Sequence, residues 1–210
     1  EHNISLNIVC IGSYIHKAVD HCHIYGSGVR TIENLEQGNL YETLNVHALR
    51  GPLSKKFLKE EKNIAVDDNI VYGDPALLLP RFYQPNIQPN LRDKIGLVPH
   101  KSNYKKYVDI VDDSSVFFLI KPTDPWEKVI DSIASCKSVV SSSLHGLICA
   151  DAYDVPNLWL EQYKLGEGDF KFRDYFLSQH RDYVKISSLD EYDESLLYDK
   201  INFSDALFVA

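Results

Sequence analysis

The chain has 210 residues, of which 44% are hydrophobic and 25% charged, and its formal net charge is −8. These proportions are those of an ordinary globular protein that can bury a core in one large domain or two small ones. The acidic balance excludes a general nucleic-acid binder, since such proteins carry a basic surface. No apolar run approaches the roughly 20 residues that span a bilayer, and the four cysteines lack paired spacing, which indicates reduced thiols and a cytoplasmic protein.

Apolar runs alternate with amphipathic ones through the first half of the chain. The pattern predicts strands at Leu6–Ile11, His21–Tyr25 and Leu44–Arg50, and helices at Tyr14–Asp20 and Pro52–Glu61. Proline is tolerated in the first turn of a helix, so it can open the last of these helices. Alternating strands and helices indicate an α/β domain.

Two short segments that follow strands in this half are candidates for ligand contact. Gly26-Ser27-Gly28 allows a ligand to approach the backbone closely, although a tight turn explains the same residues equally well. Arg50 lies beside Gly51, and a guanidinium suits bidentate recognition of phosphate or carboxylate. A salt bridge within the protein is the alternative role for this arginine.

A polar connection between residues 80 and 93 interrupts the alternation. It contains Pro80, Pro85 and Pro89 among glutamine and asparagine residues, which is typical of an irregular linker. We therefore predict an N-terminal domain at residues 1–84, a second domain at residues 85–180 and a helical tail at residues 181–210.

Beyond this connection the alternation restarts. Strands are predicted at Lys94–Pro99, Ser115–Ile120, Ser138–Ser141 and Asn157–Leu160, and helices at Ser102–Val111, Asp124–Ala134 and Leu144–Tyr153. Continuous apolar strands between helices indicate a parallel sheet that is covered on both faces. The predicted fold class is therefore α/β, with doubly wound, Rossmann-like domains.

The most informative stretch is 141–152, where a serine cluster joins a buried strand to an apolar helix. Ser142 and Ser143 suit a helix N-cap, and the amides of the first helical turn favour an anion. His145 in that turn is unusual, although a well-capped crossover with an incidental histidine is the simpler interpretation. Ligands of parallel sheets bind at the carboxyl ends of strands, and His100, Lys121 and His145 follow three strands of this half.

Other chemistries find little support in the sequence. His21 and His23 would share one face of a strand with no further ligand, whereas a structural zinc needs four, so no metal site is predicted. The GxSxG elbow of serine hydrolases is absent. Acidic pairs such as Glu60-Glu61 fall in helices or turns and do not have the spacing of glycosidase carboxylates.

Four motifs in this order resemble the polysaccharide pyruvyl transferases. They are ALRGPLS at 48–54, YGDPA at 72–76, KIGLVPH at 94–100 and SSLHG at 142–146, and the resemblance covers roughly residues 20–180. It implies two Rossmann-like domains facing a cleft, as in the GT-B glycosyltransferases. It also implies transfer of a pyruvyl group from phosphoenolpyruvate to a sugar, with Arg50 as the basic anchor and Leu144-His145 as the family's Leu-His pair.

The chain departs from the family pattern in two places. Many members carry an arginine immediately before the Leu-His pair, where this chain has Ser143, so an expected cation is absent or replaced by one such as Lys121. Members also usually begin with a glycine-rich strand–loop–helix carrying a Gly-Asp pair, which is not visible here. Because the chain also contains no methionine, we expect its N-terminal domain to be incomplete.

The residues and the resemblance together predict a site for phosphoenolpyruvate, a trianion that requires cations and N–H donors. Arg50, His100 and His145 are the predicted catalytic residues, with His145 as a general acid that the bound phosphate keeps protonated. The predicted substrate-binding residues are Gly26, Ser27, Gly28, Lys121, Ser142, Ser143, Leu144 and Gly146. No metal or cofactor is expected besides the donor. The expected acceptor is the sugar of a polysaccharide or of its lipid-linked precursor, reached through peripheral membrane association.

Two other functions fit part of this pattern. A GT-B-type glycosyltransferase with a nucleotide-sugar donor would share the two-domain cleft and would use an acidic residue such as Glu161 to hold a ribose. A non-catalytic carbohydrate-binding protein would carry aromatic platforms at the strand ends, but the tyrosine and phenylalanine residues are scattered along the sequence.

Overall fold

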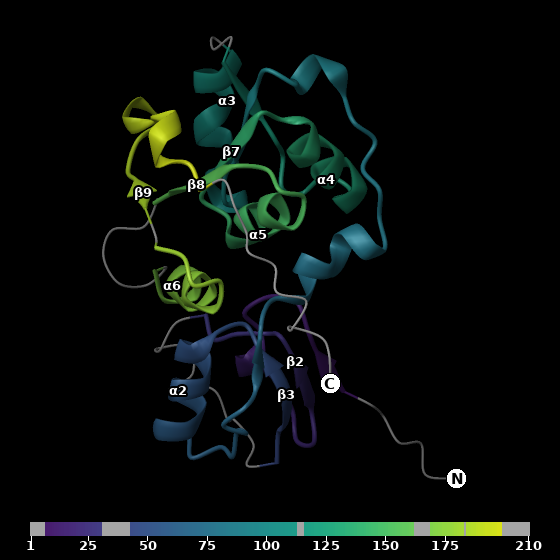
Figure 1. Cartoon of the computed structure of the whole chain (residues 1–210), viewed down its shortest axis with the longest axis vertical. Coiled ribbons are helices and arrows are strands. Elements are labelled where there is room, and N and C mark those ends of the chain that lie inside the picture. Colours follow the sequence, from purple (N-terminus) through teal and green to yellow (C-terminus); the bar gives the residue numbers. More distant parts are fainter. Residues whose placement is uncertain (1–6, 31–42, 113–115, 162–168, 183, 199–210) are drawn as a thin grey trace. The chain divides into compact units, whose positions relative to one another are not determined.

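The computed structural model of the chain describes residues 7–30, 43–112, 116–161, 169–182 and 184–198 (Figure 1). The described residues form two compact units. Unit 1 is drawn from Glu1–Pro75 and Tyr163–Asp182, and unit 2 from Ala76–Gln162 and Tyr183–Ile201. Within the described residues, no helix has the length and apolar character that crossing a membrane requires.

Unit 1 is built on a parallel sheet of four short strands in the order β1-β2-β3-β4. The strands are β1 at Ile8–Val9, β2 at His23–Tyr25, β3 at Asn45–Leu49 and β4 at Val71–Tyr72. Helices α2 (Pro52–Glu60) and α6 (Asp169–Ser178) belong to the same unit and pack against one another (Figure 1). The buried core includes Ile15, Ile24, Leu49, Phe57 and Leu58.

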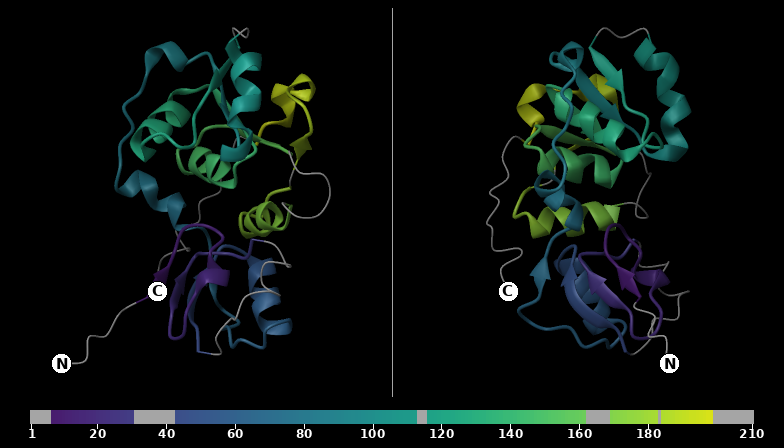
Figure 2. Two further views of the ribbon diagram at one scale, coloured as in Figure 1. Left: turned by 180° about the vertical axis from the view of Figure 1, so that it is seen from behind. Right: turned by 90° about the vertical axis from the view of Figure 1, so that its right-hand side faces the viewer.

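Unit 2 is built on a parallel sheet of five strands in the order β6-β5-β7-β8-β9. The strands are β5 at Ile95–Val98, β6 at Phe117–Leu119, β7 at Ser138–Ser141, β8 at Asn157–Leu160 and β9 at Lys185–Ile186. The helices of this unit are α3 at Tyr104–Asp112, α4 at Trp126–Ser135 and α5 at Leu144–Ala152. Figure 2 shows the unit from two further sides.

Both faces of the five-stranded sheet are covered, which explains why its central strands are apolar throughout. Every residue of β5, β7 and β8 is buried. One core cluster joins Leu97 and Val140 to Tyr107 of α3. A second cluster joins Val98 and Val139 to helices α4 and α5. Successive strand residues point to opposite faces, so each strand contributes to both clusters, and the predicted α/β fold with parallel sheets is confirmed.

The structure differs from the sequence prediction mainly in short elements and in the place of α6. The predicted helix at 14–20 is a single 3₁₀ turn, Ile15–Lys17, and the predicted helical tail contributes β9 and two 3₁₀ turns. Helix α6 was expected in the second domain, but it lies in unit 1 because its carboxylate Asp174 binds residues of that unit. The spacing of residues along the sequence does not reveal that this later helix packs in unit 1.

Candidate active site

The carboxyl ends of β5 and β7 form the topological switch point of unit 2. From β5 the chain moves outward through α3 to the edge strand β6, and it then returns through α4 to β7 on the other side of β5. The loops after β5 and β7 therefore lead away in opposite directions. In open parallel sheets this divergence leaves a crevice in which ligands bind.

Two loops meet at this switch point through Ser142. Its Oγ accepts a hydrogen bond from the His100 amide at 2.9 Å, and its own amide donates to the Val98 carbonyl at 3.1 Å. The side chain of Ser142 is buried, so it acts as a fixed link between the two strand ends. The structure thus brings His100 and the serine cluster together, as the sequence predicted.

The start of α5 is shaped by Ser141 and Gly146. Ser141 Oγ lies 2.8 Å from the carbonyls of both Val98 and Ser143, which share its single O–H donor, and it accepts the Ser143 amide at 3.0 Å. A Cβ added at Gly146 would lie 2.3 Å from Ser141 Oγ and 3.0 Å from Val98 Cβ, so a side chain at 146 would force the helix away from the sheet. Close packing therefore requires glycine in the Leu-His-Gly segment.

Ser143 is the N-cap residue of α5, but its side chain makes no capping hydrogen bond. The first-turn amides of a helix have no acceptor within the helix and carry partial positive charge. Leu144, His145 and Gly146 supply these amides at the carboxyl edge of the sheet, and the His145 ring is half-buried there. The turn has the donors that an anion requires.

His100 has a defined ring environment. Its Nδ1 lies 2.8 Å from Ser102 Oγ and accepts the Ser102 amide at 3.4 Å. The Ser102 hydroxyl can donate to Nδ1 or accept from it, depending on the tautomer of the ring, and when Nδ1 donates, Nε2 is the nitrogen that can take up a proton. Lys121 follows β6, the strand beside β5, and its ammonium lies 6.0 Å from the centre of the Tyr104 ring.

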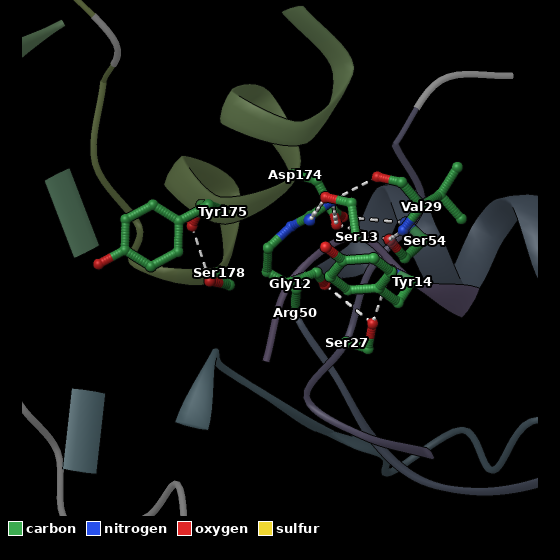
Figure 3. A network of polar contacts seen from close by, with 10 residues as sticks. All are labelled: Gly12, Ser13, Tyr14, Ser27, Val29, Arg50, Ser54, Asp174, Tyr175 and Ser178. Atoms are coloured by element: carbon green, nitrogen blue, oxygen red, sulfur yellow. Dashed lines mark hydrogen bonds and ion pairs between the residues drawn. The ribbon is translucent and has the colours of Figure 1, made fainter. Parts of the chain in front are cut away.

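Arg50 lies in unit 1, where its side chain is fully buried (Figure 3). Nη1 donates to Ser13 Oγ at 2.6 Å, and Nη2 donates to the Val29 carbonyl at 2.6 Å and to Asp174 Oδ2 at 3.0 Å. The salt bridge that the sequence left open is therefore present. A ligand anion could reach this guanidinium only if the pair with Asp174 opened.

Asp174 also occupies the N-terminus of α2. Its Oδ1 accepts the Ser54 amide at 2.9 Å, and its Oδ2 accepts the Ser54 hydroxyl at 2.6 Å. The N-cap residue of α2 is Gly51, which has no side chain to cap with. A carboxylate from α6 thus fills the anion position of the Arg-Gly-Pro motif, satisfying both the arginine and the helix start.

The predicted ligand loop Gly26-Ser27-Gly28 is a buried segment that bends at Gly26 and packs against this network. Ser27 is fully buried, donates to the Gly12 carbonyl at 2.8 Å and accepts the Tyr14 amide at 3.1 Å (Figure 3). Gly26 has φ +79°, and a Cβ at Gly28 would lie 2.3 Å from Arg50 Cζ. Both glycines are thus required by the packing of the segment itself.

Lys171 of α6 adds a second positive charge near Arg50. Burial, together with repulsion from Arg30 and Arg50, lowers the pKa of its ammonium to about 8. Burial of the ammonium is the largest cause of this shift, and the two arginines add to it. No sequence pattern pointed to Lys171 or to Asp174.

His21 and His23 are not arranged as a pair of metal ligands. His21 precedes β2 in a left-handed conformation, with φ 58°, and His23 Nδ1 lies 2.8 Å from His47 Nε2. Their centroids are 5.1 Å apart with nearly coplanar rings, so the two rings meet edge to edge through a hydrogen bond. Among the described residues, no three His, Cys, Asp or Glu side chains gather as a metal site would require.

A model of the polysaccharide pyruvyl transferase family matches residues 7–162, about three quarters of the chain. The chain belongs to this family. Among curated proteins it is similar to an uncharacterized protein of Acanthamoeba polyphaga mimivirus, with 33% identity over 135 residues. These residues are 61% of this chain and 46% of the relative, so the chain spans about half the relative's length. No solved structure matches the chain.

In this member of the family, the motifs fall at the carboxyl ends of strands in both units. Arg50 follows β3, Asp74 follows β4, His100 follows β5 and His145 follows β7. Glu161, the residue that a nucleotide-sugar enzyme would use for a ribose, follows β8 and pairs with Lys185 at 2.6 Å. Its carboxylate is therefore already engaged within unit 2.

Proposed function

We propose that the chain transfers a pyruvyl group from phosphoenolpyruvate to a sugar, forming a cyclic ketal. The observation that carries the proposal is the meeting of His100, Ser142 and the His145 turn at the switch point of a parallel sheet. Membership of the family supports a pyruvyl transfer onto a polysaccharide. The donor, the acceptor and the site residues are our proposal.

Donor binding is assigned to the start of α5. Phosphate or carboxylate oxygens accept hydrogen bonds from the amides of Leu144, His145 and Gly146, with the hydroxyl of Ser143 beside them. Lys121 follows β6, which is separated from β7 by β5, and it compensates for the cation that Ser143 does not supply. Arg50, with the Gly26–Gly28 segment beside it, is assigned the role of the family's basic anchor in unit 1. In this role Arg50 exchanges its ion pair with the Asp174 carboxylate for one with the carboxylate of the donor.

The chemistry assigns one proton transfer to each histidine. Protonated His145 gives its proton to the methylene carbon of phosphoenolpyruvate, which leaves the adjacent carbon electron-poor. A sugar hydroxyl attacks that carbon and loses its proton to His100 as base. A second hydroxyl of the same sugar then displaces phosphate and closes the ketal. Its proton leaves with the phosphate as hydrogen phosphate, and proton exchange with solvent returns both histidines to their starting states. Proton transfers of this kind contribute about 10²–10⁴-fold each.

The remaining expectations belong to the same proposal. They are a GT-B-like pairing of the two units, an acceptor sugar on a polysaccharide or on a lipid-linked precursor, peripheral membrane association, and action in the cytoplasm. The proposed steps use no metal or cofactor. Phosphoenolpyruvate-dependent labelling of a membrane fraction would test the lipid-linked acceptor.

Phosphate release tests the proposed reaction. The full-length protein is incubated with phosphoenolpyruvate and a panel of candidate glycans, and released phosphate is measured. We expect His145→Ala to lower the rate by about 100-fold or more, because it removes the acid. The control His47→Ala changes an exposed histidine of β3 and should leave the rate unchanged. A rate near wild type in His145→Ala would reject the assignment.

A further inference from the structure

A cavity of about 350 Å³ lies at the carboxyl end of the edge strand β6. It is large enough for one sugar ring with its substituents, since small-molecule sites begin near 300 Å³. Its lining comes from the start of α3, the end of β6, the loop after β6 and helix α4: Tyr104, Phe118, Leu119, Ile120, Lys121, Asp124, Lys128, Val129 and Ser132. All of these residues belong to unit 2.

The exposed lining is mostly polar, and a smaller apolar part lies beside the polar groups. Phe118, Ile120 and Val129 present hydrocarbon, and Tyr104 adds an aromatic ring. The polar groups include the Asp124 carboxylate, which lies 2.7 Å from the Lys128 ammonium. A sugar has the matching character, because its ring carries C–H groups on its faces and hydroxyls around its rim.

The ion pair favours a neutral polyol over an anion. Asp124 is only 22% exposed at its side chain, and its hydrogen bond to Lys128 raises the pKa of that ammonium. A carboxylate accepts hydrogen bonds from hydroxyls, but it repels a phosphate or carboxylate ligand. Lys128 is largely neutralised by the same contact. Lys121 also lines the cavity, so the Asp124 carboxylate rather than the net charge of the lining is what favours a hydroxyl ligand here.

The cavity lies next to the site proposed for the reaction. Strands β5 and β6 are hydrogen-bonded neighbours, and parallel strands lie about 4.8 Å apart. Lys121 follows β6, and Tyr104 comes four residues after His100. A sugar in the cavity would thus place hydroxyls beside the strand end that carries His100.

We propose that this cavity is the acceptor subsite, and that Asp124 and Lys128 bind hydroxyls of the acceptor sugar. The proposal rests on the proposed pyruvyl transfer for its role in the reaction. Sugar binding by the cavity can be measured without that reaction. Asp124 and Lys128 act on affinity and specificity, because neither is assigned a proton transfer.

The test compares acceptor and donor affinities in matched variants of the full-length protein. Asp124→Asn keeps the shape of the side chain and removes its charge, and Glu127→Gln removes a charge from the same part of α4 outside the cavity. We expect Asp124→Asn to raise KM for the acceptor about tenfold, as loss of a charge-assisted hydrogen bond does. KM for phosphoenolpyruvate should not change in either variant.

Direct binding separates this proposal from the reaction. Saturation-transfer NMR with methyl glycosides of glucose, galactose and mannose should show at least one sugar bound by the wild type and weakened by Asp124→Asn. If the sugar binds in this way but no phosphate is released in the enzyme assay, the cavity is supported as a sugar site and pyruvyl transfer is rejected. The proposal would be overturned if Asp124→Asn left KM for the acceptor unchanged. It would also be overturned if the variant raised only KM for phosphoenolpyruvate, and that result would assign the cavity to the donor.

Discussion

The side chain of Arg50 is held by three neighbours of its own unit. Ser13, the Val29 carbonyl and Asp174 accept hydrogen bonds from its two terminal nitrogens, and no solvent reaches it. A buried guanidinium needs such partners, because an unpaired charge in the interior costs several kcal/mol. The motif arginine therefore organises the loops that follow β1 and β2, whichever ligand the unit binds.

Lys171, near this network, should make the stability of unit 1 depend on pH. Its pKa is about 8 in the folded chain and 10.5 when unperturbed, so between these values the unfolded chain binds more protons. Stability therefore rises as the pH increases through this range, and the full penalty is present below pH 8. Lys171→Met removes the charge and should raise the melting temperature by a few degrees at pH 7.

Thermal unfolding from pH 7 to 10.5 measures this effect. The advantage of Lys171→Met over the wild type should shrink as the pH approaches 10.5. The control Lys62→Met also removes an ammonium that lies over a phenylalanine ring of unit 1. An advantage that is the same at every pH, or equal in the control, would contradict a titrating lysine.

Helix α5 is the element whose local sequence and packing agree most closely. Its residues are buried on nearly all sides, since α5 lies between β7, β8 and α4. The glycine of the Leu-His-Gly segment lets its first turn lie against Ser141 and Val98. Because this contact places the His145 turn at the strand ends, a change in the position of the helix would displace the groups of the proposed donor site.

Gly146→Ala should destabilise unit 2 and weaken donor binding together. The added methyl would overlap Ser141 Oγ, which is held by two carbonyls and cannot move freely. Overpacking of this kind costs about 1–3 kcal/mol. Urea unfolding measures the loss, and KM for phosphoenolpyruvate should rise. The control Cys149→Ala, on the same helix, adds no volume; an equal rise in KM there would contradict the argument.

At the scale of the whole molecule, unit 1 is closed by residues far apart in the sequence. Asp174 and Arg50 are 124 positions apart, and α6 follows the strands of unit 2 along the chain before it packs on α2. The predicted domain boundary at residue 180 would have kept α6 in the second domain. The buried carboxylate explains the return, because it satisfies an arginine and a helix N-terminus at once.

Asp174→Ala should therefore destabilise unit 1 rather than unit 2. Removing one partner of a buried ion pair costs about 3–5 kcal/mol, because the other charge stays buried without compensation. Hydrogen exchange should show lost protection in α2 and β3, with β5 and β7 protected as in the wild type. Arg173→Ala, which changes an exposed residue of the same helix, is the control. Uniform loss of protection in both units would contradict this assignment.

The regular elements of unit 2 could be predicted because local patterns determine them. Residues 138–152 contain an apolar strand, a serine cap and an apolar helix, and the structure has β7 and α5 there. The two-residue strands β4 and β9 escaped prediction, since two residues carry no periodicity. The switch point itself followed only from strand order, which a sequence pattern does not contain.

The sequence by itself determined the α/β class, the family and the histidines at the strand ends. It could do so because hydrophobic periodicity, capping residues and motif order are local properties. The tertiary structure decided that Arg50 is paired with Asp174, that Ser142 joins the loops after β5 and β7, and that Tyr104, Lys121, Asp124 and Lys128 line one cavity. These contacts join residues from different elements, and strand order and helix packing alone bring them together.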